Sequence, residues 1–109
     1  MDEAKHEGDG PFDRLDPELT VFALANGLDL AKSDDYRRLE WFSEGLERAI
    51  LIYCDETGRL HLQAMTWRSG KTEARSERTV GDALAVDEVK GALERAIEIA
   101  NELSAPSGE

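Results

Sequence analysis

The chain has few of the residues on which several common classes of protein depend. Only one of its 109 residues, Cys54, is a cysteine, which excludes an internal disulfide. Aromatic residues make up 6%, and no apolar run approaches the roughly 18 residues that a membrane-spanning helix needs. Residues 1–7 lack the basic and apolar segments of a secretion signal. We therefore expect a cytoplasmic protein with no membrane segment.

Positive charge is also scarce, and charge is distributed unevenly. The formal net charge is -11, of which residues 1–18 contribute -5, residues 19–35 -2, residues 36–80 +1 and residues 81–109 -5. Acidic flanks repel phosphate, so this pattern argues against binding to nucleic acid or to an anionic membrane. Many carboxylates, four lysines and 13 alanines suit a halophilic protein or, alternatively, a GC-rich genome, and both interpretations stay open.

The length suits one small domain between two tails. Residues 1–14 are acidic and contain Gly8, Gly10 and Pro11, while residues 104–109 are small or polar. Both segments are predicted to be disordered, which leaves a single α+β domain over residues 15–103. Whether the chain is a fragment of a larger protein stays open.

The N-terminal part of that domain has the pattern of a helix. Asp16-Pro17-Glu18 predicts its start, because Asp16 can cap free N–H groups and Pro17 lacks a donor that this position leaves unpaired. Asn26-Gly27 predicts its end, with an extension to Lys32 if Gly27 is tolerated inside the helix.

The C-terminal part predicts a strongly amphipathic helix with Asp82 or Asp87 near its start. Apolar residues follow the 3.6-residue period on one side of it: Val86, Val89, Leu93, Ala96, Ile97, Ala100 and Leu103.

The near-neutral centre has the pattern of strands. Residues 49–54 form a continuous apolar run and residues 60–67 alternate, while residues 72–80 alternate Arg and Glu as a charge-protected edge strand does. Turn signals lie between these segments, which predicts an antiparallel meander. Residues 34–46 can be read as a strand or as a helix, and Gly45 favours the strand.

These elements predict an α+β fold with an N-terminal helix, a three- to four-stranded antiparallel meander sheet and a C-terminal amphipathic helix. The order is broadly like that of many small interaction modules, including acidic secretion-chaperone-type folds. No motif connects the chain to a family, so the likeness is one of architecture alone.

The turn at residues 55–59 sets which residues of the central hairpin meet. Asp55 with Thr57-Gly58 favours a type I turn closed by Gly58 in the left-handed conformation. This three-residue loop pairs Cys54 with Leu60. One sheet face then presents a dry apolar surface to the helices, and the other face holds a mixed set: Ala49, Leu51, Tyr53, His61, Gln63, Met65 and Trp67.

That mixed face has the composition of interface cores. If one helix packs on each side of the sheet, a helix covers the face. If both helices share the other side, the face must meet a partner or a second subunit, because monomers rarely expose so large an apolar patch. The candidate interaction residues are Tyr53, His61, Gln63, Met65 and Trp67.

Catalytic and metal-binding constellations are weak. A two-residue loop would place Cys54 opposite His61 as nucleophile and base or as two ligands, but the only other histidine, His6, lies in the predicted tail. Gly70-Lys71-Thr72 matches the end of a phosphate-binding loop, yet Met65 stands where that motif needs glycine. We expect no catalytic residue, no metal and no cofactor.

A basic cluster at the third turn does not change this view. Glu73 and Glu77 lie among its members, which argues against a nucleic-acid site; the cluster comprises Arg68, Lys71, Arg75 and Arg78.

The sequence therefore predicts a small acidic, non-enzymatic protein-interaction module that acts through the mixed face or by self-association, as in a homodimer. The alternative is a small-molecule-binding protein or an enzyme with a pocket between sheet and helix near Tyr53, Cys54 and His61.

Overall fold

The sheet of the computed structural model has five strands, and the described residues are 11–71 and 75–104. The elements in chain order are α2 (Pro11–Asn26), β1 (Asp29–Lys32), β2 (Tyr36–Ser43), β3 (Leu46–Cys54), β4 (Leu60–Trp67), β5 (Ser76–Leu84) and α3 (Val86–Glu102). The strands lie in the order β1-β2-β3-β4-β5, and each neighbouring pair is antiparallel. The predicted α+β meander is confirmed, with one or two more strands than the sequence indicates.

The turn after β2 decides between strand and helix for residues 34–46. Glu44 and Gly45 have φ angles of 57° and 79°, and they join Ser43 to Leu46, which are cross-strand partners. Two successive residues with positive φ form the two-residue turn that matches the twist of a hairpin. The strand interpretation is therefore correct, and the helix interpretation is wrong.

The turn at residues 55–59 has the predicted form. Gly58 has a φ of 86°, and the Asp55 N–H donates to the Arg59 carbonyl at 2.9 Å. The Asp55 Oδ1 atom accepts from the backbone N–H of Thr57 at 2.9 Å, which fixes the turn from inside. Cys54 therefore pairs with Leu60, as the three-residue loop requires.

The end of α2 explains the strand that the sequence analysis missed. Gly27 has a φ of 70°, and the Leu28 N–H donates to the Ala23 carbonyl at 2.9 Å, which is the bond of a Schellman motif. The helix thus ends at Asn26, and the extension to Lys32 is wrong. Residues 29–32 instead form β1, a four-residue edge strand. Because its first and last residues are charged, the sequence shows no clear strand alternation there.

The start of α2 also differs from the prediction. The helix begins at Pro11, so residues 11–14 of the predicted tail belong to it. Leu15 is fully buried and Phe12 packs at the edge of the core, which extends the apolar stripe of the helix upstream of Asp16. Asp16 lies inside the helix and accepts a hydrogen bond from Arg37 Nε at 2.8 Å. The other predicted tail residues, 1–10 and 105–109, lie outside the described residues.

The edge strand that precedes the last helix lies further along the chain than predicted. β5 covers residues 76–84 rather than 72–80, and residues 72–74 of the prediction lie outside the described residues. Asp82 is consequently a strand residue, whereas Asp87 lies in the first turn of α3. The Glu88 Oε1 atom accepts from the Ala85 N–H at 2.7 Å at the start of this helix.

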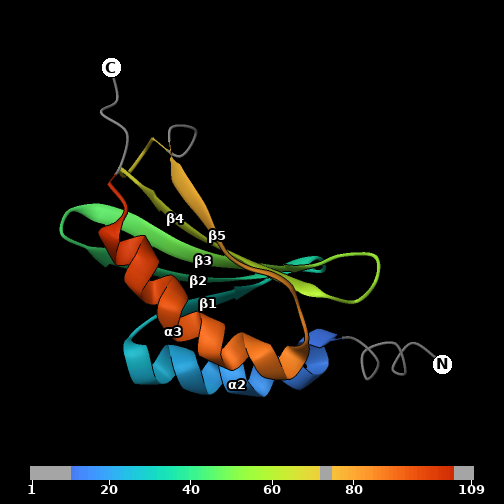
Figure 1. Ribbon diagram of the computed structural model, residues 1–109. Coiled ribbons are helices and arrows are strands. Elements are labelled where there is room, and N and C mark those ends of the chain that lie inside the picture. The colour runs from blue at the N-terminus through green and yellow to red at the C-terminus, as the bar shows by residue number, and fades with distance from the viewer. Residues whose placement is uncertain (1–10, 72–74, 105–109) are drawn as a thin grey trace.

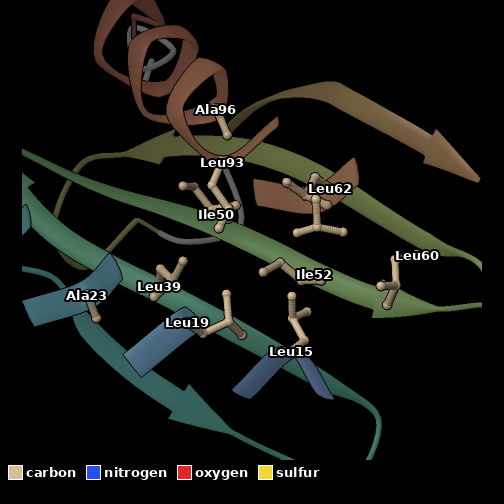
Figure 2. Close-up of a cluster of buried hydrophobic side chains, with 11 residues drawn as sticks. Leu15, Leu19, Ala23, Leu39, Ile50, Ile52, Leu60, Leu62, Leu93 and Ala96 are labelled. Atoms are coloured by element: carbon tan, nitrogen blue, oxygen red, sulfur yellow. The ribbon is translucent and has the colours of Figure 1, made fainter. Parts of the chain in front are cut away.

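Both helices pack on the same face of the sheet (Figure 1). α3 contacts β3, β4 and β5, while α2 contacts β1 and α3. Figure 2 shows side chains from both helices meeting one face of β2, β3 and β4. The cluster comprises Leu15, Leu19, Ala23, Leu39, Ile50, Ile52, Leu60, Leu62, Val89, Leu93 and Ala96.

Candidate interaction surface

The second face of the sheet is covered by neither helix. Successive side chains of a strand point to opposite faces, so the residues between the core positions point away from α2 and α3. We call this surface the open face. Its twelve central positions are Tyr36, Arg38, Glu40 and Phe42 on β2, Glu47, Ala49, Leu51 and Tyr53 on β3, and His61, Gln63, Met65 and Trp67 on β4.

The register places all five candidate interaction residues on the open face. Tyr53 and His61 are cross-strand partners, and Gln63, Met65 and Trp67 follow at alternate positions of β4. Their role in binding stays a prediction. The four positions of β2 were not among the predicted surface residues, although the turn signal at Ser43-Glu44-Gly45 could have placed them opposite β3.

The centre of the open face is apolar and closely packed. Ala49 is 0% exposed and its cross-strand partner Met65 is 6% exposed, although no helix covers them. Their strand neighbours Leu51 and Gln63 pair with each other and are half-buried. At one end Phe42 is 63% exposed. An apolar centre with an exposed aromatic ring at its end is typical of a surface that binds protein.

One ion pair lies beside this apolar centre. Arg38 and Glu40 are two residues apart on β2, and the Arg38 Nε atom contacts Glu40 Oε2. Their cross-strand partners on β3 are Leu51 and Ala49 respectively. About a third of each charged side chain is exposed, so the pair is screened by solvent and adds little to stability by itself.

The opposite end of the open face is held by a histidine between two carboxylates. The His61 Nε2 atom lies 2.7 Å from Asp55 Oδ2, and its Nδ1 atom lies 2.6 Å from Asp82 Oδ1. The imidazole also stacks on the Tyr53 ring, with 5.0 Å between ring centroids and an interplanar angle of 11°. Both ring nitrogens are therefore engaged within the sheet.

These contacts shift the pKa values of His61 and Asp55. The hydrogen bond to Asp55 raises the pKa of His61 above its usual value, against the opposing effect of burial, and Asp82 adds to the rise. Hydrogen bonds from Thr57 and then His61 hold the pKa of Asp55 well below its usual range. The imidazole and the two carboxylates form a structural network in which both imidazole nitrogens are engaged, so neither is free to act as a base.

Cys54 does not join this network. It pairs with Leu60 and packs beside the core on the helix-covered face, whereas His61 lies on the open face. Burial, followed by the charge of Asp55, raises the pKa of the thiol, which disfavours the nucleophilic thiolate. Within residues 11–71 and 75–104, no three His, Cys, Asp or Glu side chains are grouped to hold a metal ion.

A buried arginine on the helix-covered face was not foreseen. Arg48 is 2% exposed, and its Nη1 atom donates to the carbonyl of Ala100 at 2.6 Å and to that of Leu103 at 3.3 Å. The Thr66 hydroxyl donates to the same Ala100 carbonyl at 2.8 Å. A cation at the negative end of a helix dipole stabilises it, so Arg48 fixes the C-terminus of α3 to β3 and β4.

A groove of about 670 Å³ lies between the two helices, away from the open face. Its apolar lining includes Phe22 of α2 and Leu93 and Ile97 of α3, with Glu94 and Glu98 among its charged residues. The alternative prediction placed a pocket near Tyr53, Cys54 and His61, and none of these three residues lines this groove.

Neither α2 nor α3, the helices of the described part of the chain, has the length and apolar character needed to cross a membrane. Comparison of the chain with protein-family models, with curated proteins and with solved structures gave no match.

Proposed function

We propose that this protein is a non-enzymatic interaction module that binds a polypeptide through the open face. The observation that supports this proposal is the position of both helices on the other side of the sheet. Neither helix covers this face, and its partly exposed apolar and aromatic side chains Leu51, Tyr53, Trp67 and Phe42 lower the free energy of the system when a partner covers them.

The chemistry of the face favours binding over catalysis. Its most perturbed titratable group, His61, bonds to Asp55 and Asp82 and stacks on Tyr53. Such a network orders the end of the sheet, and pre-ordered side chains lower the entropic cost of association. The single half-buried cysteine is compatible with a reducing compartment, so we place the function in the cytoplasm.

Capture by tagged protein tests this proposal. Tagged wild-type chain, the open-face variants Phe42→Lys and Leu51→Lys and the helix variant Leu24→Lys are incubated with an extract of the cells that produce the chain, supplemented with an untagged copy. Leu24 is a matched control because it is an apolar side chain on α2 that is 80% exposed, comparable with the 63% of Phe42.

We expect wild type and Leu24→Lys to retain the same polypeptides, and both open-face variants to lose them. A buried lysine in an apolar interface costs several kcal/mol, enough to remove a micromolar partner. Equal retention by wild type and the open-face variants would contradict the proposal. Loss by Leu24→Lys alone would move the binding surface to the helices.

A further inference from the structure

The arrangement of charged and apolar side chains on the open face indicates which polypeptide binds there. We infer that the partner is a second copy of this chain, related by a two-fold axis that lies between the two sheets and crosses the strands at right angles. This inference rests on the proposed function and names the polypeptide that the open face binds.

The sheet register provides the geometric basis. Strand pairing aligns Leu30, Leu39, Ile50, Ala64 and Arg78 in one row across the sheet, with side chains toward the helix-covered face. On the open face, two rows flank this central row at equal distances along the strands. The first row contains Arg38, Leu51 and Gln63, and the second contains Glu40, Ala49 and Met65.

A two-fold axis beneath the central row superposes the first row of one copy on the second row of the other. Arg38 then faces Glu40 of the partner subunit, and Glu40 faces Arg38 of the partner subunit. Together with the ion pair inside each chain, the four charges alternate in sign around a ring. Each charge that is desolvated by contact therefore gains an opposite charge, which is the condition for burying ion pairs without a large penalty.

The uncharged positions of the two rows also face one another under this operation. The large Leu51 faces the small Ala49 of the partner subunit, and Gln63 faces Met65 of the partner subunit. A large side chain opposite a small one allows two sheets to interdigitate.

The aromatic ends of the face meet in the same arrangement. Tyr36 lies three positions to one side of Leu39, and Phe42 lies three positions to the other side, so the two face each other across the axis. His61 and Trp67 of β4 are related in the same way around Ala64. The axis thus places the Tyr36 ring on the Phe42 ring and the His61 imidazole near the Trp67 indole, and both are favourable aromatic contacts.

The other two-fold arrangement fits the surface poorly. An axis parallel to the strands would place β2 over β4, so that Arg38 meets Gln63 and Glu40 meets Met65. It would also bring Asp29 on β1 toward Glu77 on β5, a pair of like charges. The ion pair would lose solvent and gain no opposite charge, which disfavours this arrangement.

The acidic net charge does not oppose the inferred dimer strongly. α2 and α3 together contain eight acidic and three basic side chains, and both helices lie on the far side of each sheet from the contact. At about 0.15 M salt the Debye length is about 8 Å, so repulsion between the helices of the two copies is largely screened.

The size of the face predicts a weak dimer. Strand spacing of about 4.8 Å and a rise of about 3.3 Å per residue give the sheet a footprint of roughly 600 Å². This is below the roughly 800 Å² per partner of a standard stable interface, so we expect a dissociation constant on the order of micromolar.

Exchange of the two charges tests both the partner and the register. The double variant Arg38→Glu/Glu40→Arg keeps the ion pair within each chain and recreates the charge ring when two exchanged copies meet. In a mixed dimer, by contrast, arginine would face arginine and glutamate would face glutamate.

Sedimentation velocity measures the dimerisation of wild type, of the single variant Arg38→Glu and of the double variant. Native mass spectrometry of wild type mixed with a mass-tagged double variant measures the mixed species.

We expect wild type and the double variant to dimerise alike, Arg38→Glu to dimerise on the order of tenfold or more weakly, and the mixed dimer to be depleted to the same degree. Denaturant unfolding confirms that each variant folds. Dimers that mix freely would overturn the inferred register.

A wild-type chain that stays monomeric up to about 100 μM, well above the expected dissociation constant, would overturn the second copy as partner. In that case the proposed function would still be decided separately, by whether Phe42→Lys loses polypeptides other than the chain itself in the capture experiment.

Discussion

Ile50 and Leu51 are neighbours in β3, but they lie on opposite faces of the sheet and in different surroundings. Ile50 is 0% exposed beneath α2 and α3, whereas Leu51 is half-buried on the open face. Their similar size and hydropathy mean that the residues themselves do not set this difference. It arises from the placement of both helices on one side of the sheet, so that neither helix covers the face on which Leu51 lies.

The two faces also differ in how they accommodate arginine. Arg48 on the helix-covered face is 2% exposed and bonds to backbone carbonyls at the end of α3, so its charge stabilises the fold. Arg38 on the open face pairs with a neighbouring carboxylate and stays over a third exposed. The charge that stabilises the fold is enclosed by its partners, whereas the charge that we propose to contact a binding partner is accessible to solvent.

The largest expected effect comes from truncating the adjacent apolar residues of β3. Ile50→Ala removes buried methyl groups and leaves a cavity, which should lower the free energy of unfolding by about 3 kcal/mol. Leu51→Ala should lower it by less than about 1 kcal/mol in dilute solution, because that side chain keeps contact with water. Urea unfolding at low protein concentration measures both values. Equal losses would mean that the open face is already covered within the monomer.

Substituting the two arginines extends the comparison to charge. Arg48→Ala leaves the carbonyls at the end of α3 with fewer donors and opens space in the core, so we expect a loss of about 2 to 3 kcal/mol. Arg38→Ala should cost less than about 1 kcal/mol.

Glu44→Gln serves as the control for the buried arginine. The Glu44 carboxylate lies 3.4 Å from Arg48 Nη2 but is 80% exposed, so its removal should have little effect on stability. Should Arg48→Ala and Arg38→Ala prove equally mild, the enclosed arginine would have no special role at the end of α3.

The central hairpin could be predicted in detail because local chemistry determines it. Asp55 and Gly58 specify the turn, the turn specifies that Cys54 pairs with Leu60, and alternation then assigns every side chain of β3 and β4 to a face. The composition of the candidate surface on these two strands therefore followed from the sequence.

The features that the sequence analysis missed depend on contacts between distant segments. The apolar stripe of each helix shows that the helix packs against another element, but it does not show against which face of the sheet. Four residues of β1 show too little alternation to predict a strand before its pairing with β2 is known. Arg48 occupies an ordinary position in the alternating pattern of β3. Its burial is favourable only because the distant Ala100 carbonyl at the end of α3 accepts its hydrogen bond.

The smallest expected effect is a pH dependence confined to one end of the open face. The pKa of His61 is raised by folding, so the resulting stabilisation is complete below the unfolded histidine pKa of about 6.5 and is lost as the pH rises through the raised value. The pKa of Asp55 is lowered, so its contribution is present above the unfolded aspartate pKa of about 3.9 and is lost as the pH falls. The combined stabilisation is therefore greatest between these limits.

Urea unfolding midpoints from about pH 6 to pH 9 measure this effect on the side where His61 titrates. We expect the wild-type midpoint to fall with rising pH and the His61→Gln midpoint to stay flatter, while NMR titration of Asp82→Asn shows a lower pKa for His61. His6→Gln controls for the second histidine and should behave as wild type. If His61→Gln keeps the full pH dependence, the carboxylates around the imidazole do not stabilise the fold. If the dependence disappears in His61→Gln while Ile50→Ala remains equally costly at every pH, the His61 network gives the open face a pH-dependent stabilisation that the apolar burial of Ile50 does not have.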